Sequence, residues 1–536
     1  MTRRRDWSHV ALPLVIVAIA ALLRGWQLET IPLGLHGDEA ITGMDARHAL
    51  AAGWIGPYLY PSALGQPAGP VYLTALLFRY LPQSTATLRG SIALFGVAAV
   101  FFTYLAARAM CGRRVGLVAA ALLAVLPWHL HLSRTAFMVN AWPAVEMAAL
   151  WLLFVARRRA GRARTALVAA LGAVAGLGIY SYNAFVLCVP LLATPFLYDW
   201  LGGRGAGRRA AVGAAAIAGL AALLVALPML DYVRTHEEFF WHQEEVGVVH
   251  TAAWQDADWS TRAGMLAGRS AEWSRGVVLG GRRDDGDGLA DRGYPLLDPL
   301  TALLALAGIG LALRGWRRPA HGVLLVALLT VPWGALLTIE DGLYRRTYGL
   351  APLLCMLAAL PVAALWRRAA TPSAPRTAVR ISLAGLAVLL AGSAARNAYR
   401  YFVPLQDTEQ MRYVFPYQVD AASRFIAALP ADRVVYWFSE RWPASYETRR
   451  WFAPDANVIE QSPEFDAAPS EVAPDVVMLL GDYRKRADDW EQRYPGGHWE
   501  SAQRGDEVLF RAYVLRRGES PRHQDGEPNT KADTDH

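Results

Sequence analysis

Long apolar runs separated by short polar connections fill the chain up to about residue 396. Each run approaches the length that an α-helix needs to cross a bilayer, which is roughly 20 residues. The pattern therefore predicts about eleven membrane-spanning helices. We expect them over residues 10–23, 88–107, 115–132, 141–155, 166–180, 184–197, 210–230, 296–313, 323–338, 348–365 and 381–394.

The polar connections alternate in charge along the chain. Every second connection carries a cluster of arginines, for example Arg157, Arg158 and Arg159. Such clusters are typical of cytoplasmic connections, so we expect the amino terminus in the cytoplasm and the remaining connections outside. An odd number of spans then places everything after the last helix outside as well. The pattern predicts a multi-pass protein of the plasma (inner) membrane.

Two shorter segments in the first outer connection have a different pattern. Residues 41–52 combine apolar positions at helical spacing with charged ones, and residues 71–81 are apolar but short for a span. Both are typical of helices that lie along the membrane surface.

The pattern changes again after residue 396. Short apolar runs at 434–438, 475–480 and 508–515 predict strands, and residues 483–493 predict a helix. We therefore expect three regions, which are a transmembrane domain over 1–396, a small extracytoplasmic α/β domain over 397–516 and a disordered polar tail over 517–536.

Composition agrees with a membrane protein. Of the 536 residues, 54% are apolar, and the mean hydropathy is +0.20. The formal charge of +7 does not indicate nucleic acid, because the arginines lie in the connections where topology signals are found. The three cysteines, Cys111, Cys188 and Cys355, lie in or beside apolar runs, so neither a disulfide framework nor a thiolate metal site is indicated.

Two adjacent carboxylates, Asp38 and Glu39, follow the first span. Charged groups near a membrane are costly to desolvate, so this pair should face water, a cation or a reacting hydroxyl. One of them could act as a general base toward an acceptor hydroxyl. The alternative is a solvated loop pair or a cap for the following helix.

Arg134 lies at the outer end of the third predicted span. Its planar guanidinium could bind a phosphate. Alternatively, Arg134 could be an interfacial arginine whose side chain extends to the water layer. Tyr180, Tyr182 and Asn183 form an outer turn that could bind a sugar, although tyrosines at an interface are also the ordinary aromatic belt.

A second pair of outer arginines, Arg345 and Arg346, precedes the tenth predicted span. Arginines on this side run against the positive-inside trend. Phosphate binding would explain them, and so would pairing with Glu340 and Asp341 in the same connection.

The order of these motifs resembles a known family. The motifs are Gly37-Asp38-Glu39-Ala40 after the first span, Ser133-Arg134 after the third, the tyrosine turn, Tyr294-Pro295-Leu296-Leu297-Asp298-Pro299 before the eighth, and Arg346 six residues before Pro352. From Trp7 to about Arg396 the chain resembles the bacterial branch of the GT-C membrane glycosyltransferases. The similar group comprises protein O-mannosyltransferases and lipid A aminoarabinose transferases, which form glycosyltransferase family 39.

The resemblance implies an all-α polytopic bundle with interfacial helices over a cavity. It also implies an inverting transfer of a sugar from a polyprenyl-phosphate carrier to an acceptor, which could be a lipid, a glycan or a protein. By position, Asp38 would be the general base, Glu39 would orient the acceptor or the base, and Arg134 and Arg346 would bind the donor phosphate. Some members use a divalent metal ion near the acidic pair, where His36 is adjacent.

Two other classes of protein remain open from the sequence. A transporter or flippase for a lipid-linked glycan would carry polar residues through its spans, whereas Glu146 is the main charge in mid-span here. A non-catalytic anchor for the terminal domain would leave Asp38, Glu39 and the outer arginines without a role. The partners expected for a transferase are a polyprenyl-phosphate-linked sugar, an acceptor and membrane lipid, with no nucleic acid.

Overall fold

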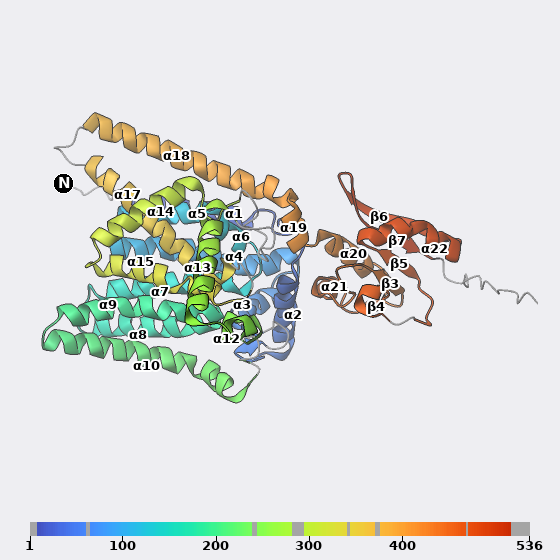
Figure 1. The fold of residues 1–536 in the computed structure, drawn as a ribbon, viewed down its shortest axis with the longest axis horizontal. Coiled ribbons are helices and arrows are strands. Elements are labelled where there is room, and N and C mark those ends of the chain that lie inside the picture. The colour runs from blue at the N-terminus through green and yellow to red at the C-terminus, as the bar shows by residue number, and fades with distance from the viewer. Residues whose placement is uncertain are drawn as a thin grey trace, which may run out of the picture. The chain divides into compact units, whose positions relative to one another are not determined.

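The computed structural model describes residues 8–59, 65–237, 239, 244–280, 294–339, 344–369, 376–467 and 470–515. The chain forms two compact units (Figure 1). The larger comprises Met1–Leu33 and Ile41–Phe415, and the smaller comprises Gly34–Ala40 and Pro416–His536. The short segment Gly34–Ala40, which carries the acidic pair, therefore belongs to the smaller unit.

The larger unit is a helical bundle, and every predicted apolar run lies in it as helix. Within the described residues, eight helices are long and apolar enough to cross a membrane. The helices over the predicted runs are α1 (Ser8–Gly25), α4 (Thr85–Cys111), α5 (Arg113–Val125), α6 (Pro127–Leu132), α7 (Ala141–Ala156), α8 (Gly161–Leu177), α9 (Val189–Gly202), α10 (Ala206–Thr235), α14 (Pro299–Arg314), α15 (Pro319–Thr330), α16 (Trp333–Leu336), α17 (Leu350–Ala369) and α18 (Arg376–Phe402). The predicted class, a polytopic membrane protein, is confirmed.

The third predicted span is broken into two helices, α5 and α6. Leu126 between them has an extended backbone, with ψ near 122°, and Pro127 follows it. A proline ring disfavours the helical conformation of the preceding residue, so the helix ends there and restarts at the proline.

Small residues allow the helices of the bundle to pack closely. Gly172 and Gly176 lie one turn apart on α8 and face α10. A Cβ atom at Gly176 would lie 2.6 Å from the carbonyl oxygen of Ala222, so only glycine fits this contact. Close packing of backbones through such a pair is a common source of helix association in membranes.

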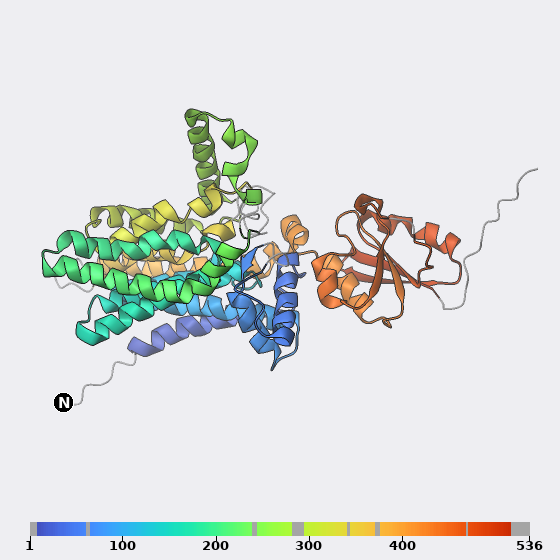
Figure 2. The same cartoon turned by 90° about the horizontal axis from the view of Figure 1, so that it is seen from below.

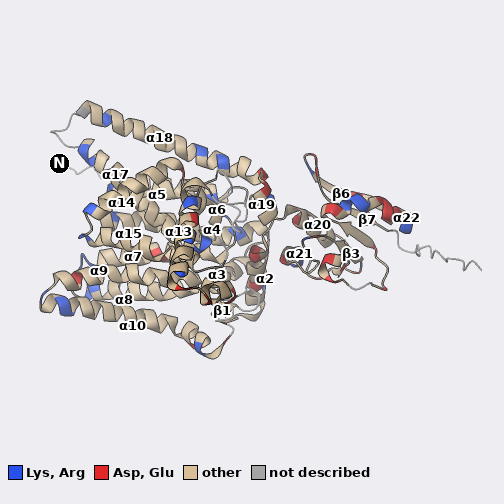
Figure 3. Ribbon diagram, viewed as in Figure 1, with Lys and Arg blue, Asp and Glu red and all other residues tan. Residues whose placement is uncertain are grey.

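The arginine-rich connections gather at one end of the bundle. Figure 3 shows the blue Lys and Arg positions where α9 ends and α10 begins, and also at the end of α17. The clusters that alternate along the sequence therefore share one end of the unit.

The connection between α1 and α4 contains α2 (Gly37–Ala52), α3 (Gly69–Phe78) and a hairpin of β1 (Tyr58–Leu59) with β2 (Gln66–Pro67). The two helices expected at 41–52 and 71–81 are present, but α2 begins four residues earlier than predicted. The connection between α10 and α14 forms α12 (Ala252–Gln255) and α13 (Trp259–Leu279), which project from one side of the bundle (Figure 2). Polar residues interrupt the apolar ones in both helices, so no apolar run in the sequence predicted them.

The smaller unit is an α/β domain around a five-stranded sheet of order β4-β3-β5-β7-β6. Strand β3 is parallel to β4 and β5, whereas β7 is antiparallel to β5 and β6. Its elements are α20 (Tyr417–Ala427), β3 (Val434–Phe438), α21 (Glu447–Phe452), β4 (Asn457–Glu460), β5 (Val476–Leu479), η8 (Gly481–Arg486), α22 (Ala487–Arg493), β6 (His498–Arg504) and β7 (Glu507–Val514).

The boundary between the units differs from the expected one at residue 396. Residues 397–415 complete α18 and form η6 (Pro404–Asp407) and α19 (Glu409–Val414). Tyr401, Leu405 and Phe415 from this stretch are buried in the core of the bundle, so the stretch belongs to the larger unit. The expected tail over 517–536 lies outside the described residues.

Candidate active site

The acidic pair lies in the first turn of α2, where a reciprocal cap starts the helix. The backbone N–H of His36 donates to Glu39 Oε2 at 3.0 Å. In return, the backbone N–H of Asp38 donates to His36 Nδ1 at 3.0 Å. This is the geometry of a capping box, with histidine in the place usually held by serine or threonine. The cap explains why α2 begins at Gly37.

The cap gives the two neighbouring carboxylates different surroundings. Glu39 is fully buried and is held by its bond to His36. The Asp38 side chain is 28% exposed, with Oδ1 3.9 Å from His36 Nδ1. The N-terminal end of a helix also favours a negative charge. Glu39 therefore caps the helix, while Asp38 presents a carboxylate at the surface of its unit.

Three residues of the terminal domain lie against this motif, and the sequence analysis did not identify them. The Thr448 hydroxyl donates to the Leu35 carbonyl at 2.8 Å, across 413 positions of sequence. Tyr446 and Glu447 lie beside Gly37. No local pattern marks them, because their position depends on a contact between distant segments.

Arg134 is surrounded by backbone carbonyls, to which its guanidinium donates hydrogen bonds. It is fully buried, and its Nη1 donates to the carbonyls of Leu23 at 2.6 Å and Arg24 at 3.2 Å. Its Nη2 donates to the carbonyls of Trp26 at 2.5 Å and Ile31 at 3.0 Å. These bonds satisfy carbonyls that the end of α1 leaves without partners. Binding of a phosphate by Arg134 would compete with all four bonds.

The tyrosine turn lies in the larger unit and connects several of its loops. The Tyr180 hydroxyl donates to a backbone carbonyl of α10 at 2.9 Å, and Tyr182 stacks on Trp142 with ring centroids 6.0 Å apart. The Asn183 amide donates to the Tyr58 hydroxyl at 3.3 Å. These contacts order the turn, and its sugar-binding role stays a prediction.

Arg345 and Arg346 lie in η5 (Tyr344–Thr347), immediately before α17. Both side chains are half-buried, and the Arg345 guanidinium carbon lies 5.3 Å from the ring centroid of Phe137. Glu340 and Asp341, the alternative partners, lie outside the described residues. The phosphate-binding role of the two arginines stays a prediction.

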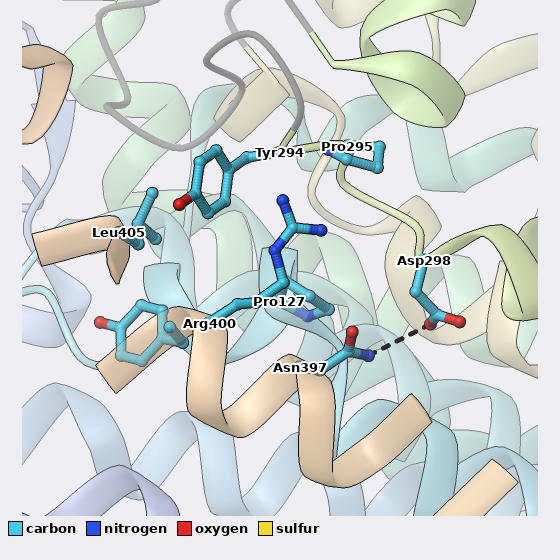
Figure 4. Close-up of a pocket in the computed structure, with 8 residues that line it drawn as sticks. Pro127, Tyr294, Pro295, Asp298, Asn397, Arg400 and Leu405 are labelled. Carbon is cyan, nitrogen blue, oxygen red and sulfur yellow. Dashed lines mark hydrogen bonds between the residues drawn. The ribbon is translucent and has the colours of Figure 1, made fainter. Parts of the chain in front are cut away.

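The segment from Tyr294 to Pro299 leads into α14 and lines a small cavity (Figure 4). The cavity has a volume of about 20 Å³, which is enough for about one water molecule. Arg400 of α18 reaches into this cavity, with its guanidinium carbon 4.4 Å from the Tyr294 ring centroid. The cavity is lined by Pro127, Tyr294, Pro295, Asp298, Asn397, Arg400, Tyr401 and Leu405.

Asp298 is the N-cap of α14 and also binds α18. It accepts the backbone N–H of Thr301 at 3.1 Å and the Thr301 hydroxyl at 2.6 Å. From α18 it accepts the Ser393 hydroxyl at 2.7 Å and the Asn397 amide at 3.2 Å.

The resemblance to metal-using members of the family finds no support in the described residues. Nowhere in the described ranges do three His, Cys, Asp or Glu side chains converge so that they could hold a metal ion. His36, which is a candidate substrate-binding residue and could also have contributed a metal ligand, uses Nδ1 in the helix cap. The residues that the structure describes do not fit a divalent ion, and we derive no step through one.

Comparison with known proteins gives similarity in structure only. No protein-family model matches the chain, and no curated protein matches it by sequence. ArnT from Cupriavidus metallidurans, solved with undecaprenyl phosphate, matches with a TM-score of 0.57 and 16% identity, over 96% of this chain and 98% of ArnT.

The oligosaccharyltransferase AglB from Archaeoglobus fulgidus also matches. Its complex with an inhibitory peptide and dolichol-phosphate gives a TM-score of 0.56 and 15% identity, over 98% of this chain and 76% of AglB. The same enzyme tethered to an acceptor peptide gives a TM-score of 0.54 and 15% identity, over 94% of this chain and 74% of AglB. ArnT and AglB are GT-C enzymes. This chain therefore has the GT-C fold, as its motifs predicted.

Proposed function

We propose that the chain is an inverting glycosyltransferase that moves a sugar from a polyprenyl-phosphate carrier to a hydroxyl or phosphate acceptor. Asp38 is the general base, and the reaction takes place on the outer face of the plasma membrane. The fold supports this proposal, since ArnT and AglB, which share it, were solved with polyprenyl-type phosphates.

The different surroundings of Asp38 and Glu39 carry the assignment of the base. A general base must reach the proton that it removes. Glu39 is buried and bonded to the start of its own helix, whereas Asp38 is partly exposed in the same turn. Of the two carboxylates, Asp38 is the one that an acceptor can approach.

The proposed step balances without a further reactant. The acceptor oxygen forms a bond to the anomeric carbon as its proton passes to the Asp38 carboxylate. The bond from the anomeric carbon to the phosphate oxygen breaks, and polyprenyl phosphate leaves with the bonding electrons. Attack from the side opposite the phosphate inverts the anomeric centre.

Fixed cations assist such a step, because negative charge develops on the departing phosphate. We assign this role to Arg345 and Arg346, whose guanidinium groups suit phosphate oxygens. Arg134 is not assigned to it, since its terminal nitrogens already donate to four carbonyls.

The test is sugar transfer by the purified protein in detergent, with a panel of radiolabelled sugar-linked polyprenyl phosphates. A transferase releases polyprenyl phosphate and forms a product of inverted configuration. A flippase in vesicles instead moves the intact lipid-linked glycan between leaflets and releases none. Movement without release, for every donor that is recognised, would contradict the proposed function.

A further inference from the structure

The acidic motif is folded as part of the terminal domain. Residues 34–40 belong to the smaller unit, whereas the chain on both sides of them belongs to the larger one. The backbones touch at Gly34, where a Cβ atom would lie 2.8 Å from the carbonyl carbon of Pro416. No larger residue fits at Gly34 unless this segment moves away from the domain.

The first turn of α21, with its N-cap Tyr446, supplies the polar contacts to this segment. Thr448 and Leu35 are both fully buried, and the Thr448 hydroxyl donates to the Leu35 carbonyl at 2.8 Å. A buried carbonyl that loses its donor is left desolvated without compensation, so this bond holds the backbone just before the helix cap.

Two further side chains of the turn reach the residue before Asp38. A Cβ atom at Gly37 would lie 3.1 Å from Glu447 Oε2 and 3.3 Å from the Tyr446 hydroxyl. Both polar groups therefore lie against the first turn of α2, next to Asp38.

The chemistry of Tyr446 suits a role as a hydrogen-bond donor. Burial raises the pKa of its phenol, and the negative charges of Glu447 and Asp38 raise it further. The phenol therefore keeps its proton over the physiological pH range. The Gly37 backbone N–H bonds to the same hydroxyl oxygen, which partly offsets this rise and ties the phenol to the first turn of α2.

We infer that Tyr446 and Thr448 are positioning residues for Asp38. Thr448 fixes the backbone before the cap, and the Tyr446 hydroxyl fixes the first turn of α2, so that residues 416–515 hold the segment that carries Asp38 within their own unit. This inference rests on the proposed function for its catalytic consequence, but the positioning itself does not depend on activity.

The experiment compares Thr448→Val, Thr448→Ser and Tyr446→Phe in the full-length protein in detergent. Ser462→Ala is the matched control, since Ser462 is a buried residue of the same domain whose hydroxyl accepts the backbone N–H of Ser439 at 2.8 Å. Hydrogen exchange of the amides of residues 35–40 is measured in each variant. In parallel, kcat and KM for polyprenyl phosphate release are measured per folded molecule.

We expect the amides of residues 35–40 to exchange at least about tenfold faster in Thr448→Val and Tyr446→Phe than in the wild type or in Ser462→Ala. We also expect kcat to fall about tenfold or more in these two variants with the donor KM unchanged. Thr448→Ser keeps the hydroxyl, so its amide exchange and its kcat should match those of the wild type. Unchanged exchange would overturn the inference, and so would faster exchange with an unchanged kcat.

Failure of the proposed function gives a different result. In that case the wild type itself releases no polyprenyl phosphate from any donor, and hydrogen exchange still decides whether Tyr446 and Thr448 hold the acidic motif. A merely structural role would lower the melting temperature and the yield of folded protein, but it would leave kcat per folded molecule unchanged.

Discussion

Asp298 at the start of α14 accepts a hydrogen bond of 3.2 Å from Asn397, which lies 99 positions later on α18. Helix α18 is long and apolar, and none of its most apolar stretch is buried inside the protein. Because the most apolar stretch of α18 is not buried, the polar contacts of α18 to Asp298 add to the attachment that its last residues, such as Tyr401, make to the core.

This attachment predicts the effect of Asp298→Ala. The variant loses an N-cap, which costs about 1 kcal/mol, and leaves the buried Asn397 amide without an acceptor, which costs about 1–3 kcal/mol. The control is Asp258→Ala, since Asp258 caps α13 through Thr261 with the same spacing but is exposed. Melting in detergent should show a clearly larger loss for Asp298→Ala. Equal losses would mean that Asp298 does not hold α18.

Arg134→Lys tests whether Arg134 closes the end of α1. A lysine offers a single ammonium in place of a planar fork, so it cannot satisfy the four carbonyls that Arg134 bonds. We expect a loss of stability of about 2 kcal/mol or more, read from the melting temperature. Arg275→Lys, at an exposed arginine paired with Glu272, should cost almost nothing. A weaker affinity for polyprenyl phosphate at unchanged stability would instead favour a phosphate ligand.

Arg346→Ala tests the phosphate site. If the Arg346 guanidinium binds the carrier phosphate, removing it should weaken binding of polyprenyl phosphate by about tenfold or more, because a charge-assisted bond is worth about 1.5–3 kcal/mol. Binding can be measured as competition with a labelled polyprenyl phosphate. Arg275→Ala removes an arginine from the solvent-exposed part of α13 and should leave the affinity unchanged. Equal affinities in both variants would place the phosphate elsewhere.

Much of the fold could be predicted from the sequence, because apolar runs of membrane length have few alternatives to helix. The fully buried strand β5 also appears as an apolar run. Strand β6 was missed because its sequence is polar and mostly exposed. The break at Leu126 follows from Pro127, but the apolar pattern runs across it without a change.

The candidate site could be predicted only in part. Adjacent carboxylates beside a span pointed to Asp38 and Glu39, and the family resemblance alone favoured Asp38 as the base, because the different surroundings of the two carboxylates depend on the His36 cap. The bonds of Arg134 to carbonyls near the end of α1 arise from contacts more than 100 positions apart. Tyr446 and Thr448 were missed for the same reason.

The most direct test of the central claim compares Asp38→Asn with Glu39→Gln in an assay of polyprenyl phosphate release. Asp38→Asn removes the base and should slow release by at least about a hundredfold while the protein melts like the wild type. Glu39→Gln keeps an acceptor for the His36 N–H, since glutamine also serves in a capping box, and should retain most of the activity. An Asp38→Asn enzyme as fast as the wild type would contradict the claim that Asp38 is the general base.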